Sequence, residues 1–240
     1  MSYTAPPVKV GFHGLLFDMD GTIIDSTAAV VNHWHTVGAE IGVDPKVILQ
    51  TSHGRRSIDM LKVLAPEKAN WDYVRHMEGL LPKLHGEDAV EIPGARALLD
   101  KLIAAHAPWA IVTSGTEPLV NGWLDRLQLP HPEHLVTAES VENGKPDPAC
   151  YVLGKEKLNL SGNGSSSSSS PHVVVFEDSP AGILSGKAAG CKVVGLVTSH
   201  TLEQVVAAQP DWIVEDLRSV EMVECSGGVV TLQISNALTQ

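Results

Sequence analysis

Short apolar runs rich in β-branched residues recur along the chain, with polar stretches between them. A run of this length that is apolar at nearly every position is typical of a strand buried on both faces of a parallel sheet. The pattern therefore predicts strands within six segments: GLLFD (14–18), WAIVTSG (109–115), HLVTAES (134–140), HVVVFEDS (172–179), CKVVGLVT (191–198) and DWIVED (211–216).

Segments with helical periodicity lie between these runs, namely GARALLDKLIAAH (94–106), EPLVNGWLDRLQ (117–128), DPACYVLGKEKL (147–158) and AGILSGKAAG (181–190). Strands that alternate with helices favour an α/β fold, a doubly wound parallel sheet of the Rossmann-like kind. Such sheets bind their ligands outside the carboxyl ends of the strands.

Residues 26–92 break the alternation and contain only helical patterns, in 26–42, 57–65 and 71–84. We expect them to form a helical cap domain inserted into a discontinuous core of residues 1–25 and 93–240. The serine run in 161–171 predicts a flexible surface loop within the core. At the end of the chain, residues 219–235 alternate around Ser-Gly-Gly and predict a hairpin.

Composition restricts the function classes. The chain has 240 residues with 43% hydrophobic and 19% charged residues, as expected for a globular protein. Its formal net charge of −11 disfavours a nucleic-acid surface. No apolar run reaches the roughly 20 residues of a membrane span, and the first residues lack a signal pattern. Three scattered cysteines argue against a disulfide framework or a zinc site. We expect a cytoplasmic monomer that binds neither nucleic acid nor membrane.

Carboxylates cluster where the predicted strands end. Asp18 and Asp20 follow the first strand, and because side chains alternate along an extended chain, they lie on the same side of it. Glu177 and Asp178 follow the strand HVVVF. Four converging carboxylates repel one another, and a hard divalent cation such as Mg²⁺ is their natural neutraliser.

Other polar groups reach the same edge of the sheet. Ser114 and Gly115 follow the strand WAIV, while Lys145 lies in the Gly/Pro-rich loop ahead of HVVVF. A hydroxyl and an ammonium group complete a pocket for a phosphoryl group. Considered on its own, Ser114 could be no more than the N-cap of the next helix, and Lys145 could be an ordinary loop lysine.

Four segments in order resemble the haloacid dehalogenase (HAD) superfamily of phosphotransferases: DMDGT (18–22), VTSG (112–115), GKPDP (144–148) and FEDSPAG (176–182). The position of the helical insertion fits the HAD subgroup with a small helical cap after the first motif. Almost the whole chain further resembles the fungal 2-deoxyglucose-6-phosphatases and glycerol-1-phosphatases.

The resemblance implies a role for each matching residue. Asp18 would be the nucleophile that forms an aspartyl-phosphate, and Asp20 the general acid and base. Mg²⁺ would bind Asp18, the Asp20 backbone carbonyl and Asp178, with Glu177 supporting it directly or through water. Four further residues would bind or orient the phosphoryl group, namely Ser114, Gly115, Lys145 and Thr22.

The resemblance also implies a substrate class, small sugar or polyol phosphates. His53, Arg55 and Arg56 in the cap are candidate substrate-reading residues, although each could be plain surface charge. A β-phosphoglucomutase-like phosphotransferase is the alternative enzyme, but its cap histidine is matched here by Val30. A catalytically inactive HAD fold that serves as a binding protein is the alternative outside enzymes.

Overall fold

A six-stranded parallel sheet forms the centre of the molecule in the computed structural model, which describes residues 2–52, 54–160 and 172–239. The strand order is β6-β5-β2-β7-β8-β9. In chain order the strands are β2 (Gly14–Phe17), β5 (Trp109–Val112), β6 (Leu135–Val136), β7 (Val173–Glu177), β8 (Lys192–Leu196) and β9 (Trp212–Val214). The predicted α/β fold with a doubly wound parallel sheet is confirmed.

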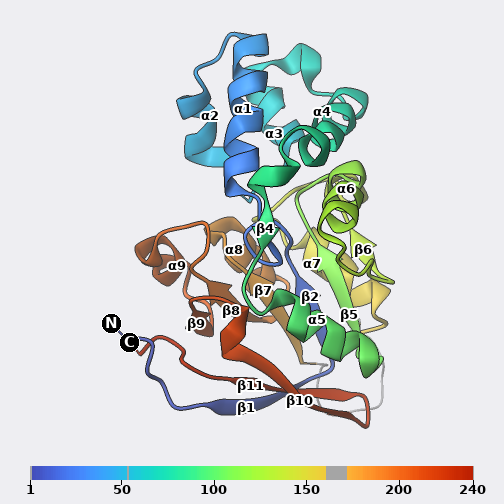
Figure 1. Ribbon diagram of the computed structural model, residues 1–240, viewed down its shortest axis with the longest axis vertical. Coiled ribbons are helices and arrows are strands. Elements are labelled where there is room, and N and C mark those ends of the chain that lie inside the picture. The colour runs from blue at the N-terminus through green and yellow to red at the C-terminus, as the bar shows by residue number, and fades with distance from the viewer. Residues whose placement is uncertain (1, 53, 161–171, 240) are drawn as a thin grey trace.

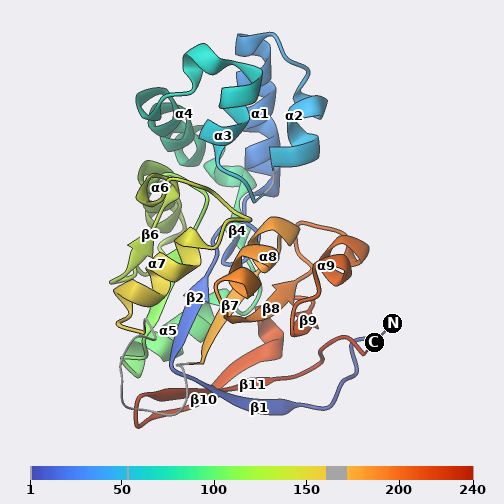
Figure 2. The same ribbon diagram turned by 180° about the vertical axis from the view of Figure 1, so that it is seen from behind.

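Helices cover both faces of this sheet (Figures 1 and 2). Helices α5 (Ala95–Ala104) and α6 (Glu117–Leu127) contribute to one apolar cluster with Leu15 and Phe17 of β2. Helices on the other face contribute to a second cluster with Leu16, namely α7 (Ala149–Lys157), α8 (Pro180–Ala188) and α9 (Leu202–Ala208). Because β2 is buried on both faces, its sequence is apolar at every position after the glycine.

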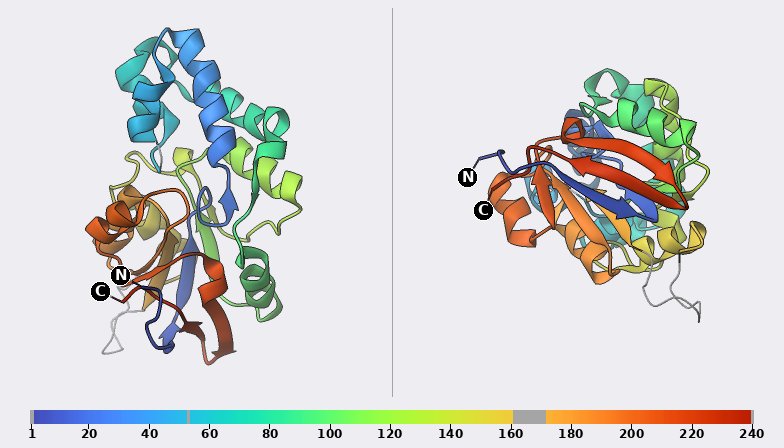
Figure 3. Two further views of the ribbon diagram at one scale, coloured as in Figure 1. Left: turned by 60° about the vertical axis from the view of Figure 1, so that its left-hand side comes forward. Right: turned by 90° about the horizontal axis from the view of Figure 1, so that it is seen from below.

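A three-stranded antiparallel sheet crosses the bottom of the core (Figure 3). Its order is β1-β11-β10, and it comprises β1 (Val8–Phe12), β10 (Val220–Ser226) and β11 (Val229–Ile234). The predicted terminal hairpin is therefore confirmed, and Gly227 and Gly228 in its turn both have positive φ. The pairing of β1 with β11 was not predicted. It brings the two ends of the chain together, where Ser2 bridges Thr239.

Four helices form a layer above the carboxyl edge of the parallel sheet (Figure 1). They are α1 (Thr27–Ile41), α2 (Pro45–Ser52), α3 (Ser57–Leu64) and α4 (Trp71–Leu84), which we call the cap. The cap has a buried apolar cluster of its own that includes Trp34, Ile48 and Leu61. Helix α2 was not predicted. A two-stranded ribbon, β3 (Ile24–Asp25) with β4 (Val90–Glu91), joins the cap to the core.

Four short 3₁₀ helices complete the secondary structure of the described residues, η1 (Pro66–Lys68), η2 (Gly86–Asp88), η3 (Ala138–Ser140) and η4 (Leu217–Ser219). None of the helices within the described ranges has both the length and the apolar character needed to cross a membrane. The predicted flexible loop of residues 161–171 lies outside the described residues.

Candidate active site

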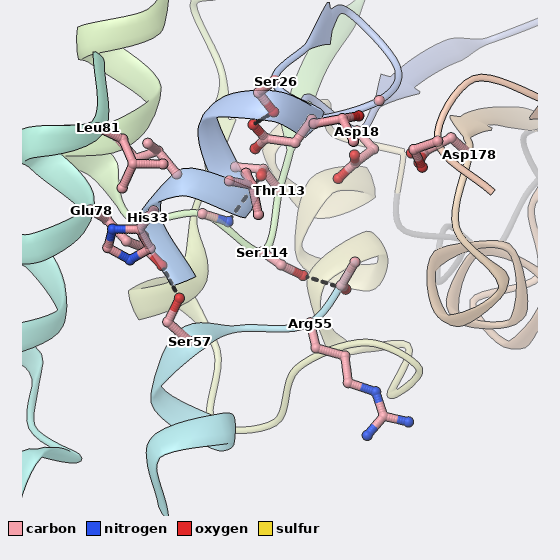
Figure 4. A pocket seen from close by; sticks show the side chains of 18 of the residues that line it. Asp18, Ser26, His33, Arg55, Ser57, Glu78, Leu81, Thr113, Ser114 and Asp178 are labelled. Carbon is pink, nitrogen blue, oxygen red and sulfur yellow. Dashed lines mark hydrogen bonds between the residues drawn. The ribbon is translucent and has the colours of Figure 1, made fainter. Parts of the chain in front are cut away.

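The strands β2, β5 and β7 are neighbours in the sheet and run parallel, so their carboxyl ends open at one edge below the cap. Asp18 directly follows β2, Thr113 follows β5, and Asp178 follows β7. All three line one pocket together with cap residues such as His33 and Glu78 (Figure 4). The pocket lies where the sequence predicts ligand binding.

Lys145 forms the electrostatic centre of the site. Its ammonium group is almost completely buried and donates to Asp18 Oδ1 at 2.5 Å and to Glu177 Oε1 at 2.7 Å. It also donates to the backbone carbonyl of Val112 at 3.1 Å. Proximity to Asp18 and Glu177 raises the pKa of Lys145 against the opposing effect of burial, so the side chain stays charged.

The surroundings of Asp18 disfavour its negatively charged form, which a nearby cation would stabilise. Burial raises the pKa of Asp18 well above its usual range, Lys145 opposes this shift, and Glu177 and Asp178 add to it. One carboxylate oxygen from each of these three acids lies within 4.8 Å of the others. A buried, oxygen-only donor set with excess negative charge fits Mg²⁺.

Asp178 is held in place by hydroxyl groups. Thr22 Oγ1 donates to Asp178 Oδ1 at 3.2 Å, and Ser199 donates to Asp178 Oδ2. Gly21 comes so close that a Cβ placed there would lie 2.3 Å from Asp178 Oδ2. Thr22, predicted to bind or orient the phosphoryl group, thus contacts Asp178 in this structure.

Glu177 differs from Asp18 and Asp178 because both of its carboxylate oxygens accept several hydrogen bonds from protein groups. Besides Lys145, Tyr151 donates its hydroxyl to Glu177 Oε1 at 2.8 Å. Glu177 Oε2 accepts from the backbone N–H groups of Asp178 and Ser179 and from the Ser179 hydroxyl, at 3.0–3.1 Å. In this arrangement Glu177 orients Lys145 and Tyr151 within a buried network.

Asp20 lines the same pocket and is half-buried. Ser26 lies at the N-cap position of α1 but donates its hydroxyl to Asp20 Oδ1 at 2.6 Å instead of capping the helix. Burial raises the pKa of Asp20 to about 6, while the bond from Ser26 opposes the shift. A carboxyl group with such a pKa can both hold and release a proton near neutral pH.

Ser114 and Gly115 line the same pocket at the end of β5. The Ser114 hydroxyl donates to the backbone carbonyl of Gly54 in the cap at 3.0 Å, and the Gly115 N–H donates to Thr113 Oγ1 at 3.0 Å. A Cβ on Gly115 would lie 3.7 Å from Asp20 Oδ2, which shows how close this turn comes to the first motif.

Comparison with known proteins agrees with this geometry. Residues 15–196 match the family model of the haloacid dehalogenase-like hydrolases. The chain belongs to this family. It is 39% identical over 226 residues to glycerol-1-phosphate phosphohydrolase 1 of Saccharomyces cerevisiae, which covers 93% of this chain and 90% of that protein.

Two further comparisons cover a similar share of the chain. The 2-deoxyglucose-6-phosphate phosphatase 2 of the same yeast is 34% identical over 241 residues, covering 94% of this chain and 96% of that protein. Among solved structures, a hydrolase from Pseudomonas syringae superposes with a TM-score of 0.69 at 22% identity, covering 85% of this chain and 94% of that one. The latter likeness concerns the fold alone.

The two arginines singled out from the sequence in the cap lie in different surroundings. Arg55 is exposed and lines the pocket. Arg56 is buried beneath the cap and donates to Asp59 and to the backbone carbonyls of 138, 141 and 142. The structure therefore brings Arg55 but not Arg56 to the pocket, and His53 lies outside the described residues.

Several pocket or support residues were missed by the reasoning from sequence: Ser26, His33, Glu78, Tyr151 and Ser199. Each comes from a helix or loop whose orientation toward the site depends on tertiary packing. Glu78 offered one signal, since it is an acid on the face of α4 that also carries the buried residues Val74 and Leu81.

Proposed function

We propose that this protein hydrolyses small sugar or polyol phosphate monoesters with Mg²⁺, through an aspartyl-phosphate on Asp18. The observation that supports this most directly is the buried Asp18 carboxylate at the end of β2, 2.5 Å from Lys145 and grouped with Asp178. Membership of the hydrolase family and 34–39% identity to curated phosphatases make the chain a phosphoric monoester hydrolase.

In the first step a carboxylate oxygen of Asp18 attacks phosphorus. The new O–P bond forms as the ester P–O bond breaks, and the leaving alkoxide takes the bonding electron pair together with a proton from Asp20. The raised pKa of Asp20, about 6, supports its role as the acid.

In the second step water replaces Asp18. The water oxygen bonds to phosphorus, the acyl-phosphate P–O bond breaks, and Asp18 regains its carboxylate. Asp20, left ionised by the first step, accepts the proton of the water. One aspartate thus forms the covalent bond while its neighbour carries the proton.

Lys145, Ser114 and the backbone N–H groups of 114–115 are proposed to bind the phosphoryl oxygens. Lys145 already donates a hydrogen bond to Asp18. Its positive charge can therefore stabilise the negative charge that passes from this carboxylate to the phosphoryl group. The bonds that Ser114 and Gly115 make to Gly54 and Thr113 would be exchanged for bonds to substrate.

Asp18 and Asp178 are proposed to hold the Mg²⁺ ion, together with the backbone carbonyl of Asp20. When bound, the ion supplies positive charge that keeps Asp18 ionised and polarises a phosphoryl oxygen. Glu177 is proposed to act on the site through Lys145, because its own oxygens accept five hydrogen bonds from protein groups.

The substrate class is inferred from the relatives and from the cap. The named relatives act on glycerol 1-phosphate and 2-deoxyglucose 6-phosphate, and both substrates are small. A cap that closes over the pocket favours small leaving groups and excludes water from the reacting phosphate. We further propose residues 26–92 as the cap domain of a core formed by 1–25 and 93–240, and a monomeric protein.

Phosphate release from a panel of esters tests the proposal. The panel contains glycerol 1- and 3-phosphate, 2-deoxyglucose 6-phosphate, hexose 6-phosphates and β-glucose 1-phosphate, each with Mg²⁺ and with chelator. We expect Mg²⁺-dependent release that is lost in Asp18→Asn. Conversion of β-glucose 1-phosphate to the 6-phosphate without release would indicate the mutase alternative, and no turnover of any ester would indicate a binding protein.

A further inference from the structure

Three polar side chains from three different cap helices meet on the pocket wall opposite the sheet. They are His33 of α1, Ser57 of α3 and Glu78 of α4, and all three line the same pocket as Asp18 and Asp20 (Figure 4). His33 and Glu78 are only 7% and 5% exposed. The hydrolytic steps described above use none of them.

Glu78 is fixed in position by two donors. The Ser57 hydroxyl donates to Glu78 Oε1 at 2.5 Å, and the backbone N–H of Thr116, at the start of α6, donates to Glu78 Oε2 at 2.8 Å. A carboxyl group can accept four hydrogen bonds, so these two bonds and the nearby Thr116 hydroxyl leave at least one acceptor position for a ligand. Within the described ranges, no lysine or arginine forms an ion pair with Glu78.

The charge of Glu78 decides which part of a substrate it can face. A phosphate monoester is anionic, and a carboxylate beside it is repulsive, as Asp20 already is toward Glu78. Glu78 is therefore suited to the uncharged leaving group. Burial raises the pKa of Glu78 to about 7, so near neutral pH it can accept a hydrogen bond as the carboxylate or donate one as the acid.

His33 adds a neutral partner to this wall. Burial lowers the pKa of His33 to about 4, and the neighbouring His85 contributes to the shift. Its imidazole is therefore uncharged at neutral pH and offers one donor and one acceptor. Apolar side chains surround the three polar ones in the pocket, namely Val30, Trp34, Leu81 and Leu119.

We propose that Glu78, Ser57 and His33 form a hydroxyl-binding subsite that reads adjacent hydroxyl groups on the leaving group. The apolar side chains contact its carbon atoms, and the subsite selects polyol and sugar phosphates over alkyl phosphates of the same size. The inference rests on the proposed phosphatase function and names the residues that set its substrate class. A site built to bond hydroxyls discriminates against ligands that lack them, because its buried polar groups are then unpaired.

Matched substrate pairs test the subsite. Glycerol 1-phosphate is compared with propyl phosphate, and 2-deoxyglucose 6-phosphate with cyclohexylmethyl phosphate, as the ratio of the two kcat/KM values in each pair. We expect Glu78→Gln to lower kcat/KM for the hydroxylated ester about 10- to 100-fold, the loss of one or two hydrogen bonds to a charged group. The alkyl ester should change less than about threefold.

The control is Glu67→Gln, the same chemical change at an exposed position of the cap. It should leave both ratios at their wild-type values. Equal losses for both members of each pair in Glu78→Gln, or an unchanged ratio, would overturn the proposal and leave Glu78 a structural residue that joins α4 to α6.

Ser57→Ala keeps the test decisive if Glu78→Gln does not fold. This variant removes a single hydroxyl, and we expect a loss of at least about threefold that is confined to the hydroxylated esters. An unchanged ratio in a folded Ser57→Ala protein would reject the subsite. Failure of the phosphatase function is distinguishable, because wild-type protein would then release phosphate from none of the esters, propyl phosphate included.

Discussion

At the scale of single residues, the site depends on a glycine that allows two loops to approach each other. Gly21 has φ of +88°, in the left-handed region that residues with a Cβ rarely adopt. Its Cα faces Asp178 so closely that an added Cβ would lie 2.3–2.9 Å from the atoms of that carboxyl group. The first motif therefore reaches the proposed metal ligand only because a side chain is absent.

We predict that Gly21→Ala lowers kcat at least about 100-fold, because Asp178 must move by more than the ~1 Å that already costs such a factor. Strain at positive φ should also lower the free energy of unfolding by about 1–2 kcal/mol. Phosphate release and urea denaturation measure the two effects. The control is Gly227→Ala in the hairpin turn, with φ of +59° and no atom within 4 Å. It should lose similar stability and keep its activity, and a comparable loss of activity in both variants would contradict the argument.

Residues that follow directly from strand ends are the ones the sequence could predict. Asp18, Asp178 and Ser114 lie beside the carboxyl ends of apolar runs, so the placement of the runs also places them at the pocket. His33 is buried while His35, two positions further along α1, is exposed. That His33 faces the pocket could not be predicted, because it depends on how α1 is rotated above the core.

At the scale of elements, the cap is tied to the core by a buried arginine. The Arg56 guanidinium donates to the carbonyls of Ala138, Val141 and Glu142 at 2.7–3.1 Å, and forms an ion pair with Asp59 at 2.7 Å. These carbonyls lie in the segment from η3 to the loop that carries Lys145. Arg56, a candidate substrate-reading residue from the sequence, thus joins α3 of the cap to the segment of the core that leads to Lys145.

We predict that Arg56→Met lowers the free energy of unfolding by about 2–4 kcal/mol, because three carbonyls and Asp59 lose a buried partner. It should also lower kcat, since the loop bearing Lys145 is no longer held. The control is Arg55→Met, which makes the same change at the adjacent exposed residue and should alter stability by less than about 0.5 kcal/mol. Urea denaturation followed by fluorescence decides, and equal stability of the two variants would count against a buried tie.

Elements with both faces buried could be predicted, and those that depend on distant pairing could not. The apolar runs of β2 and β7 are typical of central strands that are buried on both faces. Strand β1 alternates over only five residues, and its formation depends on pairing with β11 at the other end of the chain. Helix α2 is short and begins at Pro45, so its pattern spans only two turns. The ribbon of β3 and β4 has two residues on each side, too few to give a periodic signal.

At the scale of the whole molecule, the core gathers acids that the fold alone does not neutralise. The formal net charge is −11, and Lys145 is the one lysine or arginine that pairs with the Asp18, Glu177 and Asp178 cluster in the described part of the chain. Burial and mutual repulsion raise the pKa of Asp18. The cluster therefore stores unfavourable energy that a bound divalent cation would relieve.

We predict that Mg²⁺ at about 100 times its Kd stabilises the protein by about 2.7 kcal/mol, which is about 5–10 °C in Tm for a chain of this size. Protons compete with the ion, because a raised pKa keeps Asp18 protonated at low pH. The gain in Tm should therefore be larger at neutral than at acidic pH. Differential scanning calorimetry with Mg²⁺ and with chelator measures this gain in Tm.

Asp178→Asn removes one charge of the cluster and should abolish the Mg²⁺-dependent gain. It should also raise the Tm measured in chelator, since one source of repulsion is gone. If Mg²⁺ left the Tm unchanged at every pH, the prediction would be wrong, and Lys145 alone would balance the charge of the buried acids.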